Sequence, residues 1–521
     1  MKRSYKYKIG NKTIEKQINY IPLRFIIAML LTLLELCAVI AGVVALCYYV
    51  PYFYILAYIT QIVCVIRIIA SNDNPDYKVP WLLFVLILPV AGFMLYLMLY
   101  SRTFKKKYVK RLNDINDRAY KKDDSTEMAL LENESRVALS QAKMLCNIAS
   151  THLFNDTKTK YFPSGEELCA SLIQDLKNAK KFIFLEFFII EEGILWNEIL
   201  EILKQKAENG IEVKVVYDDI GCMKTLPPFY YKLLKKYGIE AVPFSMLKAG
   251  TNGEFNNRSH RKIAVVDGYI GYTGGLNLAD EYINKRVRFG HWKDSGIRLE
   301  GNGAWELTKL FIMDYGVNVR HLPKSSHNYY PVCKNEGENG YIVPFGDGPR
   351  PLYQRAVGKS IIRAMVDNAT SYVYITTPYL IIDNELCQTL ENAALRGIDV
   401  RIITPHIPDK KLVFTMTRSF YPRLIEAGVK IYEYEKGFIH AKNYLVDDEI
   451  AMVGTINLDY RSLVHHFENG IWLYNSPCIA DIKTDIENTL DKSIKIERHM
   501  LKTNVFNRAL RSLIRIFAPL L

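Results

Sequence analysis

Apolar residues are concentrated in the first hundred positions of the chain, whereas the rest of the sequence mixes apolar and polar positions. Apolar runs extend over 25–50, 53–70 and 81–100, and Pro51 separates the first two. A membrane-spanning helix needs roughly 20 apolar residues. The pattern therefore predicts a membrane region of two to three hydrophobic helices near the N-terminus.

Basic residues flank this region on both sides, from Lys2 to Lys16 and from Arg102 to Arg111. Positive flanks favour the cytoplasm, but three full spans cannot place both flanks there. Either one run does not cross, or one basic flank lies outside. The nine cysteines show neither paired nor metal-ligand spacing, which indicates a reducing compartment. We therefore expect the catalytic part to be cytoplasmic.

After about residue 160, strand-like apolar runs alternate with amphipathic helical runs. A strand at 180–190, a helix ending at Gly210 and a strand at 211–219 are matched by a strand at 371–382, a helix ending at Gly397 and a strand at 398–406. Such alternation predicts an α/β sheet, and its repetition indicates an internal duplication. We expect two duplicated α/β domains related by a pseudo-twofold axis, with one shared active site.

These patterns divide the chain into six parts. They are a basic tail at 1–22, a transmembrane anchor at 23–101, a charged linker at 102–160, two α/β domains at 161–335 and 336–500, and an amphipathic helix at 501–521. The last helix has Leu510, Leu513, Ile514 and Phe517 on one face. It suits an anionic membrane surface and equally suits packing against the protein.

The net charge of the chain indicates which class of molecule it binds. The formal net charge is +12 and the isoelectric point is about 9.0, so the chain attracts polyanions. The apolar N-terminus favours anionic membrane lipid over nucleic acid, and we expect no nucleic-acid partner. The sequence does not indicate any protein partner.

Each half of the duplication carries the same constellation of polar residues. The spacing is His, one residue, Lys, four residues, Asp, six residues, Gly, two residues, Asn. The first copy is His260, Lys262, Asp267, Gly274, Gly275 and Asn277, and the second is His440, Lys442, Asp447, Gly454, Thr455 and Asn457. Two matches at equivalent places in a duplication make coincidence a poor explanation.

This constellation suits chemistry on a phosphodiester. A His and a Lys two positions apart on a strand point to the same face, so the ammonium can hold a phosphoryl oxygen while the imidazole faces phosphorus. Glycine permits close backbone approach, and Asn offers amide donors. One histidine would attack when neutral and the other would donate a proton, through a phosphohistidine intermediate. Two lysines can supply the positive charge, so we expect no cofactor and no metal.

Several acidic residues and histidines lie outside the repeated constellation. Asp294 and Glu468 occupy matching points after each motif, and we expect each to orient a catalytic histidine. A surface acid beside a strand is the alternative. The residues with no duplicated counterpart, His291, His465 and His466, are expected to be structural, and Asp218 and Asp219 lack a visible partner for a metal site.

The paired motifs resemble the HKD motifs of the phospholipase D superfamily over about 162–495. The stretches NNRSHRKIAVVDGYIGYTGGLNLADEY and GFIHAKNYLVDDEIAMVGTINLDYRSLVHHFENG are similar to those of the bacterial cardiolipin synthases. The resemblance implies a multi-pass protein of the bacterial cell membrane that converts two phosphatidylglycerol molecules to cardiolipin and glycerol. It also implies His260 as nucleophile and His440 as acid.

Alternatives within the superfamily remain open at this point. Water could resolve the same intermediate, as in a phospholipase or a nuclease, and another alcohol could serve a different phosphatidyltransferase. A membrane scaffold with decayed motifs would have lost motif residues, but the chain has lost none.

Overall fold

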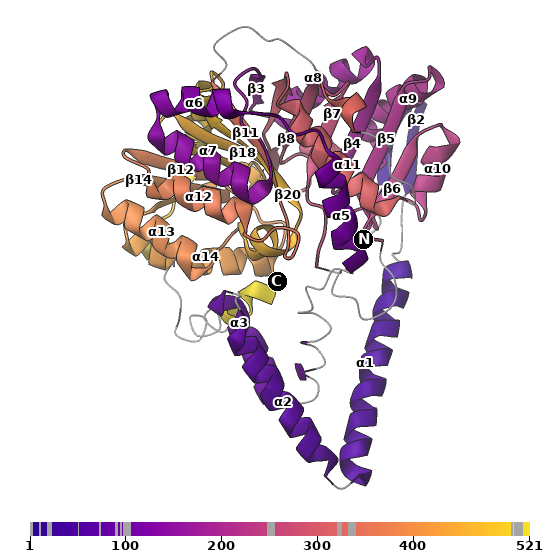
Figure 1. Ribbon diagram of the computed structural model, residues 1–521, viewed down its shortest axis with the longest axis vertical. Helices are drawn as coiled ribbons and strands as arrows, with labels where there is room; N and C mark the ends of the chain where they lie inside the picture. Colours follow the sequence, from indigo (N-terminus) through magenta and orange to yellow (C-terminus); the bar gives the residue numbers. More distant parts are fainter. Residues whose placement is uncertain are drawn as a thin grey trace.

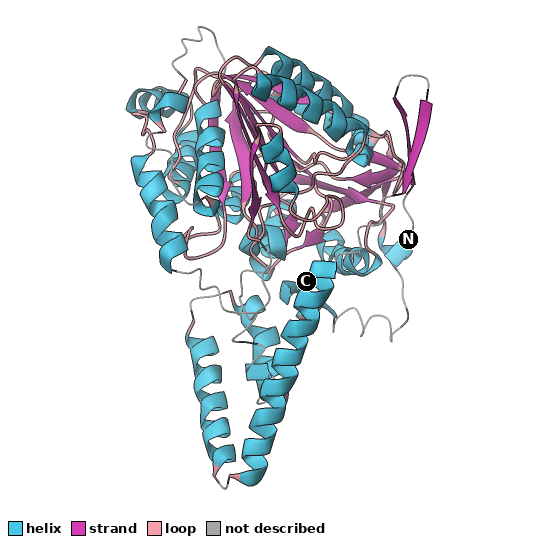
Figure 2. Cartoon of the chain, turned by 90° about the vertical axis from the view of Figure 1, so that its right-hand side faces the viewer, coloured by secondary structure: helices cyan, strands magenta, loops and turns pink. Residues whose placement is uncertain are grey.

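The computed structural model describes residues 4–9, 12–17, 23–50, 52–71, 74–88, 92–93, 96, 106–246, 256–319, 326–331, 340–501, 504 and 514–520. An α/β body carries a long helical hairpin that extends away from it (Figure 1). Strands lie in the interior of the body and helices cover its outside (Figure 2). A small N-terminal hairpin pairs β1 (Ser4–Ile9) with β2 (Lys12–Gln17).

The first half of the body is built on a seven-stranded sheet with the order β3-β10-β8-β7-β4-β5-β6. Its strands are β3 Lys158–Phe162, β4 Phe182–Phe187, β5 Glu212–Asp218, β6 Glu240–Phe244, β7 Lys262–Val266, β8 Ile270–Gly274 and β10 Gly296–Glu300. β4, β5 and β6 are parallel, and β7, β8 and β10 are added antiparallel. Every residue of β4 is buried, as its continuous apolar sequence predicts.

The second half repeats this arrangement in an eight-stranded sheet with the order β11-β20-β18-β17-β12-β14-β15-β21. Its strands are β11 Tyr341–Asp347, β12 Tyr372–Thr376, β14 Asp399–Pro405, β15 Lys430–Tyr434, β17 Asn443–Val446, β18 Ile450–Gly454, β20 Glu468–Tyr474 and β21 Ser493–Lys495. The run β20-β18-β17-β12-β14-β15 matches β10-β8-β7-β4-β5-β6 in order and direction. The predicted fold class is therefore confirmed.

Helices cover the outer faces of both sheets. The first half has α8 Gly165–Asn178, α9 Ile194–Glu208, α10 Tyr230–Lys236 and α11 Ala304–Asn318, and the second has α12 Val357–Asp367, α13 Asn384–Leu395, α14 Lys411–Glu426 and α15 Ile479–Leu490. Side-chain caps start several of them: Ser164 accepts a hydrogen bond from the Glu167 amide, and Asp383 from the Leu386 amide. Such caps satisfy amides that have no partner within the helix.

The two halves meet along their edges next to the motifs. β9 (His291–Lys293) of the first half pairs in parallel with β16 (Gly437–Ile439) of the second. The main-chain amide of His440 donates to the Lys293 carbonyl at 2.7 Å, and that of His260 donates to the Phe467 carbonyl at 2.8 Å. The backbone of each histidine is therefore fixed by the opposite half.

The predicted charged linker is folded and packed against the body. It contains α5 (Lys106–Arg118), α6 (Ser125–Glu134) and α7 (Arg136–Ala149). Ala138, Leu139, Ala142 and Leu145 form a buried stripe on α7, at the spacing of one helical face. Because this stripe packs into the core of the second half, the segment is part of the body.

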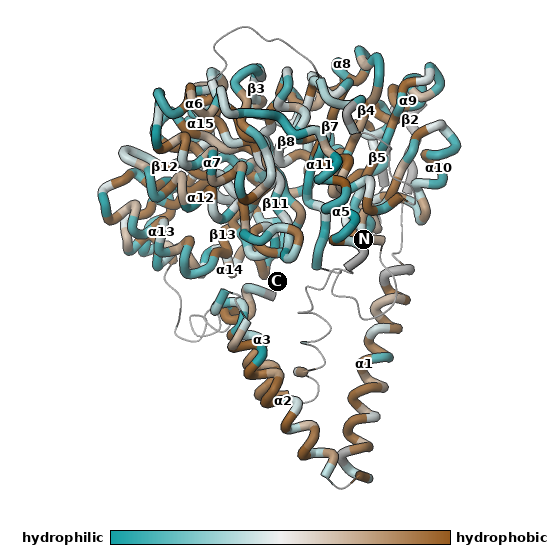
Figure 3. Tube along the Cα trace, in the orientation of Figure 1, coloured by the Kyte–Doolittle hydropathy of each residue, from teal (hydrophilic) through white to brown (hydrophobic). Residues whose placement is uncertain are grey.

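Two helices form the protruding hairpin: α1 (Leu23–Tyr49) and α2 (Phe53–Ala70). Within them, Ile26–Leu46 and Phe53–Ala70 are long and apolar enough to cross a membrane. Their side chains are mostly exposed, and Figure 3 shows both helices as almost continuously hydrophobic. The start of α1 and the end of α2 both lie at the end of the hairpin that is nearer to the body (Figure 1).

The third apolar run differs from a membrane span where it is described. Its helix, α3 (Pro75–Ile87), has 13 residues, too few to cross a bilayer. Trp81 and Val85 of α3 pack against Cys64 and Ile68 of α2. One face of α3 thus packs against protein, whereas Val79, Leu86 and Ile87 are exposed; periodicity alone does not distinguish burial in protein from contact with lipid.

The predicted C-terminal helix falls largely outside the described residues, including Leu510 and Leu513. Where it is described, the Phe517 ring lies 5.6 Å from the ring of Phe84 in α3. The segment η7 (Ala518–Leu520) also contacts α3, and both lie side by side below the body in Figure 1. The described end of the chain therefore packs on the protein.

Candidate active site

Each motif histidine is hydrogen-bonded to an acid from the other half of the chain. Nδ1 of His260 lies 2.9 Å from both carboxylate oxygens of Glu468. Nδ1 of His440 lies 2.8 Å from Oδ2 of Asp294. The structure thus brings both predicted acids to the histidines, and it pairs them across the pseudo-twofold axis.

These contacts fix the tautomer of each ring. An ionised carboxylate accepts a hydrogen bond, so each imidazole donates from Nδ1 and presents Nε2 with a free lone pair. Burial lowers the pKa of His260 to about 3 and that of His440 to about 4. Both rings are therefore neutral at physiological pH, the form in which imidazole is a nucleophile.

The acids are ionised. Burial would raise the pKa of Glu468, but the adjacent His260 holds it below its usual range. The pKa of Asp294 is also lowered, chiefly by His440, although burial alone would raise it. Further donors hold the carboxylates: Ser462 Oγ donates to Glu468 at 2.7 Å, and the Ser295 amide to Asp294 at 3.0 Å.

The two motif lysines lie next to these pairs. Nζ of Lys262 donates to the carbonyl of His260 at 2.6 Å, and Lys442 makes the equivalent contact with His440. Burial lowers the pKa of Lys262 to about 7 and that of Lys442 to about 8, and each ammonium feels both Glu468 and Asp294. The two lysines and the two acids, drawn from both halves, are therefore close enough to shift one another's protonation.

The glycine-rich positions of the two motifs serve different contacts. A Cβ on Gly275 would lie 2.0 Å from Oδ1 of Asp294 and 2.7 Å from the carbonyl oxygen of His440. Glycine is therefore required for the Asp294–His440 pair to fit. At the equivalent position, the hydroxyl of Thr455 donates to Glu468. Gly274 and Gly454 lie against the neighbouring strand, where a Cβ would meet a carbonyl oxygen at 2.4 Å.

The two motif asparagines are not equivalent. Asn277 accepts from the Ile189 amide at 3.0 Å and donates from Nδ2 to the Tyr282 hydroxyl at 2.7 Å, so its amide is used within the first half. In the second half, the main-chain amide of Asn457 donates to Ser462 Oγ at 2.8 Å. The expectation that both amides serve a phosphoryl oxygen therefore remains a prediction.

The motif aspartates lie at the far ends of their strands. Asp267 accepts from the main-chain amides of 180–182 at 2.7–3.2 Å, and Asp447 accepts from those of 370–372 at 2.6–2.8 Å. Asp267 follows β7 and His260 precedes it, so several residues of extended strand separate them. The structure does not bring these carboxylates to the histidines, and the catalytic role predicted for them lacks geometric support.

The surroundings of the two imidazoles differ. His440 is enclosed by Tyr282, Trp292 and Phe438, with ring centroids 5.4–5.9 Å away. His260 lies 5.5 Å from the ring of His466. Sequence reasoning treated His466 as structural because it lacks a duplicated counterpart. His466 lies two residues before Glu468 in the sequence, and this short spacing is a signal that it lies near the His260–Glu468 pair.

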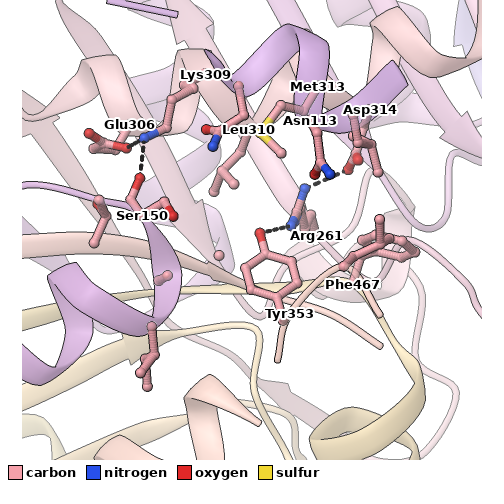
Figure 4. Close-up of a pocket in the computed structure, with 17 residues that line it drawn as sticks. Asn113, Ser150, Arg261, Glu306, Lys309, Leu310, Met313, Asp314, Tyr353 and Phe467 are labelled. Carbon is pink, nitrogen blue, oxygen red and sulfur yellow. Dashed lines mark hydrogen bonds and ion pairs between the residues drawn. The ribbon is translucent and has the colours of Figure 1, made fainter. Parts of the chain in front are cut away.

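A buried arginine supports the His260–Glu468 pair from behind. Arg261 donates from Nε to the Glu468 carbonyl at 3.1 Å, from Nη1 to Asp314 at 2.8 Å and from Nη2 to the Tyr353 hydroxyl at 3.2 Å. It lines a pocket of about 70 Å³, to which neither motif histidine contributes (Figure 4). The second half has Ala441 at this position, so this support exists on one side only.

The remaining predicted residues lie in structural contacts. Asp218 forms a buried ion pair with Arg258 at 2.9 Å, and Nδ1 of His291 lies 3.0 Å from the Tyr434 hydroxyl. The ring of His465 packs against Tyr77 of α3.

Among the described residues, one buried group, His260, His466 and Glu468, brings three potential metal-ligand atoms within 4.8 Å of one another. His260 and Glu468 in this group already share a hydrogen bond.

Two family models match the chain. The model for the cardiolipin synthase PLD-like domain matches residues 172–287 and 362–490, and the phospholipase D-nuclease N-terminal model matches 59–99. The first covers a large part of each half and both histidine motifs. The second covers most of α2 and the whole of α3.

Relatives extend the similarity over most of the chain. A cardiolipin synthase of Halalkalibacterium halodurans is 34% identical over 90% of this chain and 94% of its own length, and cardiolipin synthase 2 of Bacillus cereus is 34% identical over 88% and 89%. A solved phosphatidylserine synthase of Haemophilus influenzae shares the fold, with a TM-score of 0.55, 16% identity and coverage of 73% of this chain and 98% of its own. From the domain match and these near full-length relatives, the chain belongs to the cardiolipin synthase family.

Proposed function

We propose that this protein is a phosphatidyltransferase that joins two phosphatidylglycerol molecules to form cardiolipin and release glycerol. The observation that carries the proposal is the pair of neutral imidazoles, each held by an ionised acid of the opposite half. In this proposal, both Nε2 atoms and both buried lysines act on one substrate phosphate. A single phosphodiester monoanion matches that set of groups in charge and chemistry.

In the first step, Nε2 of His260 attacks phosphorus and forms a P–N bond. The P–O bond to the glycerol headgroup breaks, and the leaving alkoxide takes a proton from His440. Before this step, the bound phosphate anion raises the pKa of His440, and Nε2 of this imidazole takes up the proton from water. The resemblance to the superfamily's first motif assigns His260 as the nucleophile.

In the second step, the glycerol hydroxyl of another phosphatidylglycerol approaches the phosphatidyl–His260 intermediate. Neutral His440 takes the hydroxyl proton, the new P–O bond forms and the P–N bond breaks. His260 returns to its starting state. The reaction exchanges one phosphodiester for another, so it is reversible.

Glu468 and Asp294 act as positioning residues in this scheme. Each holds its histidine with Nδ1 protonated and stabilises the positive charge that develops on the ring during transfer. Lys262 and Lys442 balance the phosphate charge. We assign Asp267 and Asp447 to the structural anchoring of strand ends.

The hairpin α1–α2 is proposed to cross the bacterial cell membrane twice. Two spans place both basic flanks and the catalytic body on the cytoplasmic side, which three spans could not. Phosphatidylglycerol and anionic membrane lipid are then both available at the surface from which the hairpin emerges. The proposed limits of the two catalytic domains are 161–335 and 336–500.

A product assay tests the proposal. The full chain in neutral detergent is incubated with phosphatidylglycerol labelled in its headgroup and acyl chains, with EDTA present. Cardiolipin and glycerol in equal amounts are expected. Phosphatidic acid as the only lipid product would instead assign a hydrolase, and activity lost in EDTA and restored by a divalent cation would contradict the two-lysine scheme.

A quench experiment tests the assignment of the nucleophile. After a long incubation, phosphorus label from phosphatidylglycerol should remain covalently bound to the His440→Asn variant in alkaline denaturant, because loss of His440 slows formation of the phosphohistidine but also removes the base that resolves it. His260→Asn should retain no label. The opposite pattern would exchange the two roles, and label on neither variant under single-turnover conditions would rule out the covalent route.

A further inference from the structure

A second polar pocket lies where the body joins the membrane hairpin. It has a volume of about 400 Å³ and is enclosed by the start of α3, the start of α12 and the segment η5 (Arg461–His465). Asn74, Pro75 and Tyr77 form its wall on the α3 side. Neither histidine motif contributes to its lining, so it is distinct from the site of phosphatidyl transfer.

Positive charge dominates this pocket. Four cations, Arg350, Arg355, Lys359 and Arg363, line it together with two acids, Asp383 and Glu385. Lys359 contacts both acids, and Arg363 lies 3.4 Å from Glu385. Arg355 is exposed and forms no ion pair within the described ranges. The cations in the lining thus outnumber the acids, and the guanidinium of Arg355 is available to an anion.

The position of the pocket indicates which anion reaches it. α2 ends at Ala70, and α3, whose first residues line the pocket, begins at Pro75. The start of α3 lies at the base of the apolar hairpin (Figure 1). The phosphate layer of a bilayer lies just beyond the ends of its spanning helices. Ile381, Leu463 and Val464 add apolar surface to the lining, which suits the glycerol and the first acyl carbons of a lipid.

We propose that this pocket binds the phosphate headgroup of an anionic phospholipid, separately from the substrate phosphate at the two histidines. Arginine is suited to this role because its planar fork donates two parallel hydrogen bonds to phosphate oxygens. Basic pockets beside transmembrane helices bind lipid headgroups by the same chemistry. The assignment does not depend on which reaction the histidines catalyse.

The pocket also adjoins a segment that supports the catalytic pair. Leu463 and Val464 of η5 line the pocket, and their neighbour Ser462 donates to Glu468 at 2.7 Å. Glu468 in turn holds His260. A lipid in the pocket therefore contacts the same short helix that fixes the support of one catalytic histidine.

Binding is tested without turnover, by titration calorimetry of the full chain in neutral maltoside micelles. The probe is dihexanoyl phosphatidic acid, with dihexanoyl phosphatidylcholine and inorganic phosphate as separate arms. Arg355→Ala should weaken binding of the phosphatidic acid about tenfold, the effect of one charge-assisted contact. Arg498→Ala is the control, since it also removes an exposed arginine, one outside the pocket, and it should leave the affinity unchanged.

Two results would overturn the proposal. Equal affinity for phosphatidic acid in the wild type and both variants would exclude the pocket as its site. Arg355-dependent binding of inorganic phosphate as tight as that of the lipid would assign the pocket to free phosphate. Because Arg355 is exposed, both variants should keep the wild-type melting temperature, which is measured alongside. A lack of cardiolipin synthesis would leave this binding result unaffected.

Discussion

Nδ1 of His260 and the carboxylate of Glu468 are 2.9 Å apart although 208 residues separate them in the chain. Replacing Glu468 with Gln removes the anion but keeps the size of the side chain. We expect kcat to fall about 10- to 100-fold, as for other residues that orient a reactive histidine, with little change in KM. Steady-state kinetics with phosphatidylglycerol measures this split.

A control for this variant is available in the same half of the chain. Glu391 forms an ion pair with Arg423 between α13 and α14, away from the histidines. Glu391→Gln should preserve kcat. A Glu468→Gln enzyme with wild-type kcat would show that the cross-half pair does not contribute to the reaction.

The pH dependence of kcat/KM should report the two buried lysines. Burial lowers the pKa of Lys262 to about 7 and that of Lys442 to about 8, so both ammonium groups lose their protons between pH 7 and 9. We expect kcat/KM to fall as the pH rises through this range, because the phosphate loses its cationic partners. No acid limb is expected between pH 5 and 7, since the pKa values of both histidines are about 3 and 4.

The effect of pH on stability can be separated from its effect on kcat/KM. In the unfolded chain a lysine keeps its proton up to a pKa of about 10.4, so between pH 7 and 10 the unfolded state binds more protons at these two positions. Their contribution to stability therefore rises with pH. The Lys262→Arg variant, whose side chain stays charged, should lose less kcat/KM across this range. An identical decline in that variant would contradict the assignment.

The motif aspartates should affect stability more than chemistry. Asp267→Asn and Asp447→Asn each replace a carboxylate that accepts three main-chain hydrogen bonds by an amide that accepts fewer. We expect the free energy of unfolding to fall by roughly 1–3 kcal/mol, while kcat per folded molecule stays within about threefold of wild type. Denaturant unfolding in detergent and active-site titration measure the two quantities. A large loss of kcat with unchanged unfolding would restore the catalytic role.

Gly275 and Thr455 should respond differently to small substitutions. Gly275→Ala places a methyl group 2.0 Å from the Asp294 carboxylate, so the Asp294–His440 pair must move and activity should fall at least about 100-fold. Thr455→Ser keeps the hydroxyl that donates to Glu468 and should stay near wild type. Thr455→Val removes that donor and should lower kcat. Equal activity of Gly275→Ala and wild type would mean that the tight packing is not required.

The duplicated fold and the histidine motifs were accessible from the sequence because their signals are local. Strand and helix periodicities repeat within each half, and the spacing from His260 to Asn277 recurs from His440 to Asn457. Aligning the halves even identified Asp294 and Glu468. The alignment could not show which acid meets which histidine, since that depends on how β9 and β16 join the two sheets.

Other features depend on tertiary packing that periodicity does not encode. The apolar run 81–100 has the length of a membrane span, yet Trp81 and Val85, where it begins in α3, are buried against α2. The motif aspartates share the spacing of the catalytic residues but lie at the opposite ends of their strands. The structure thus separates the motif aspartates from the paired histidines, and it places His466 and Arg261 beside the His260–Glu468 pair.

The exchange of acids between the halves has a consequence for how this chain can change over time. A half expressed alone would hold an imidazole without its carboxylate, and a carboxylate without its imidazole. Neither fragment would transfer phosphatidyl groups, whereas mixing the two fragments would restore both histidine–carboxylate pairs. Once fused in this way, the sister copies could drift apart in their glycine, threonine and arginine positions, but neither could be discarded.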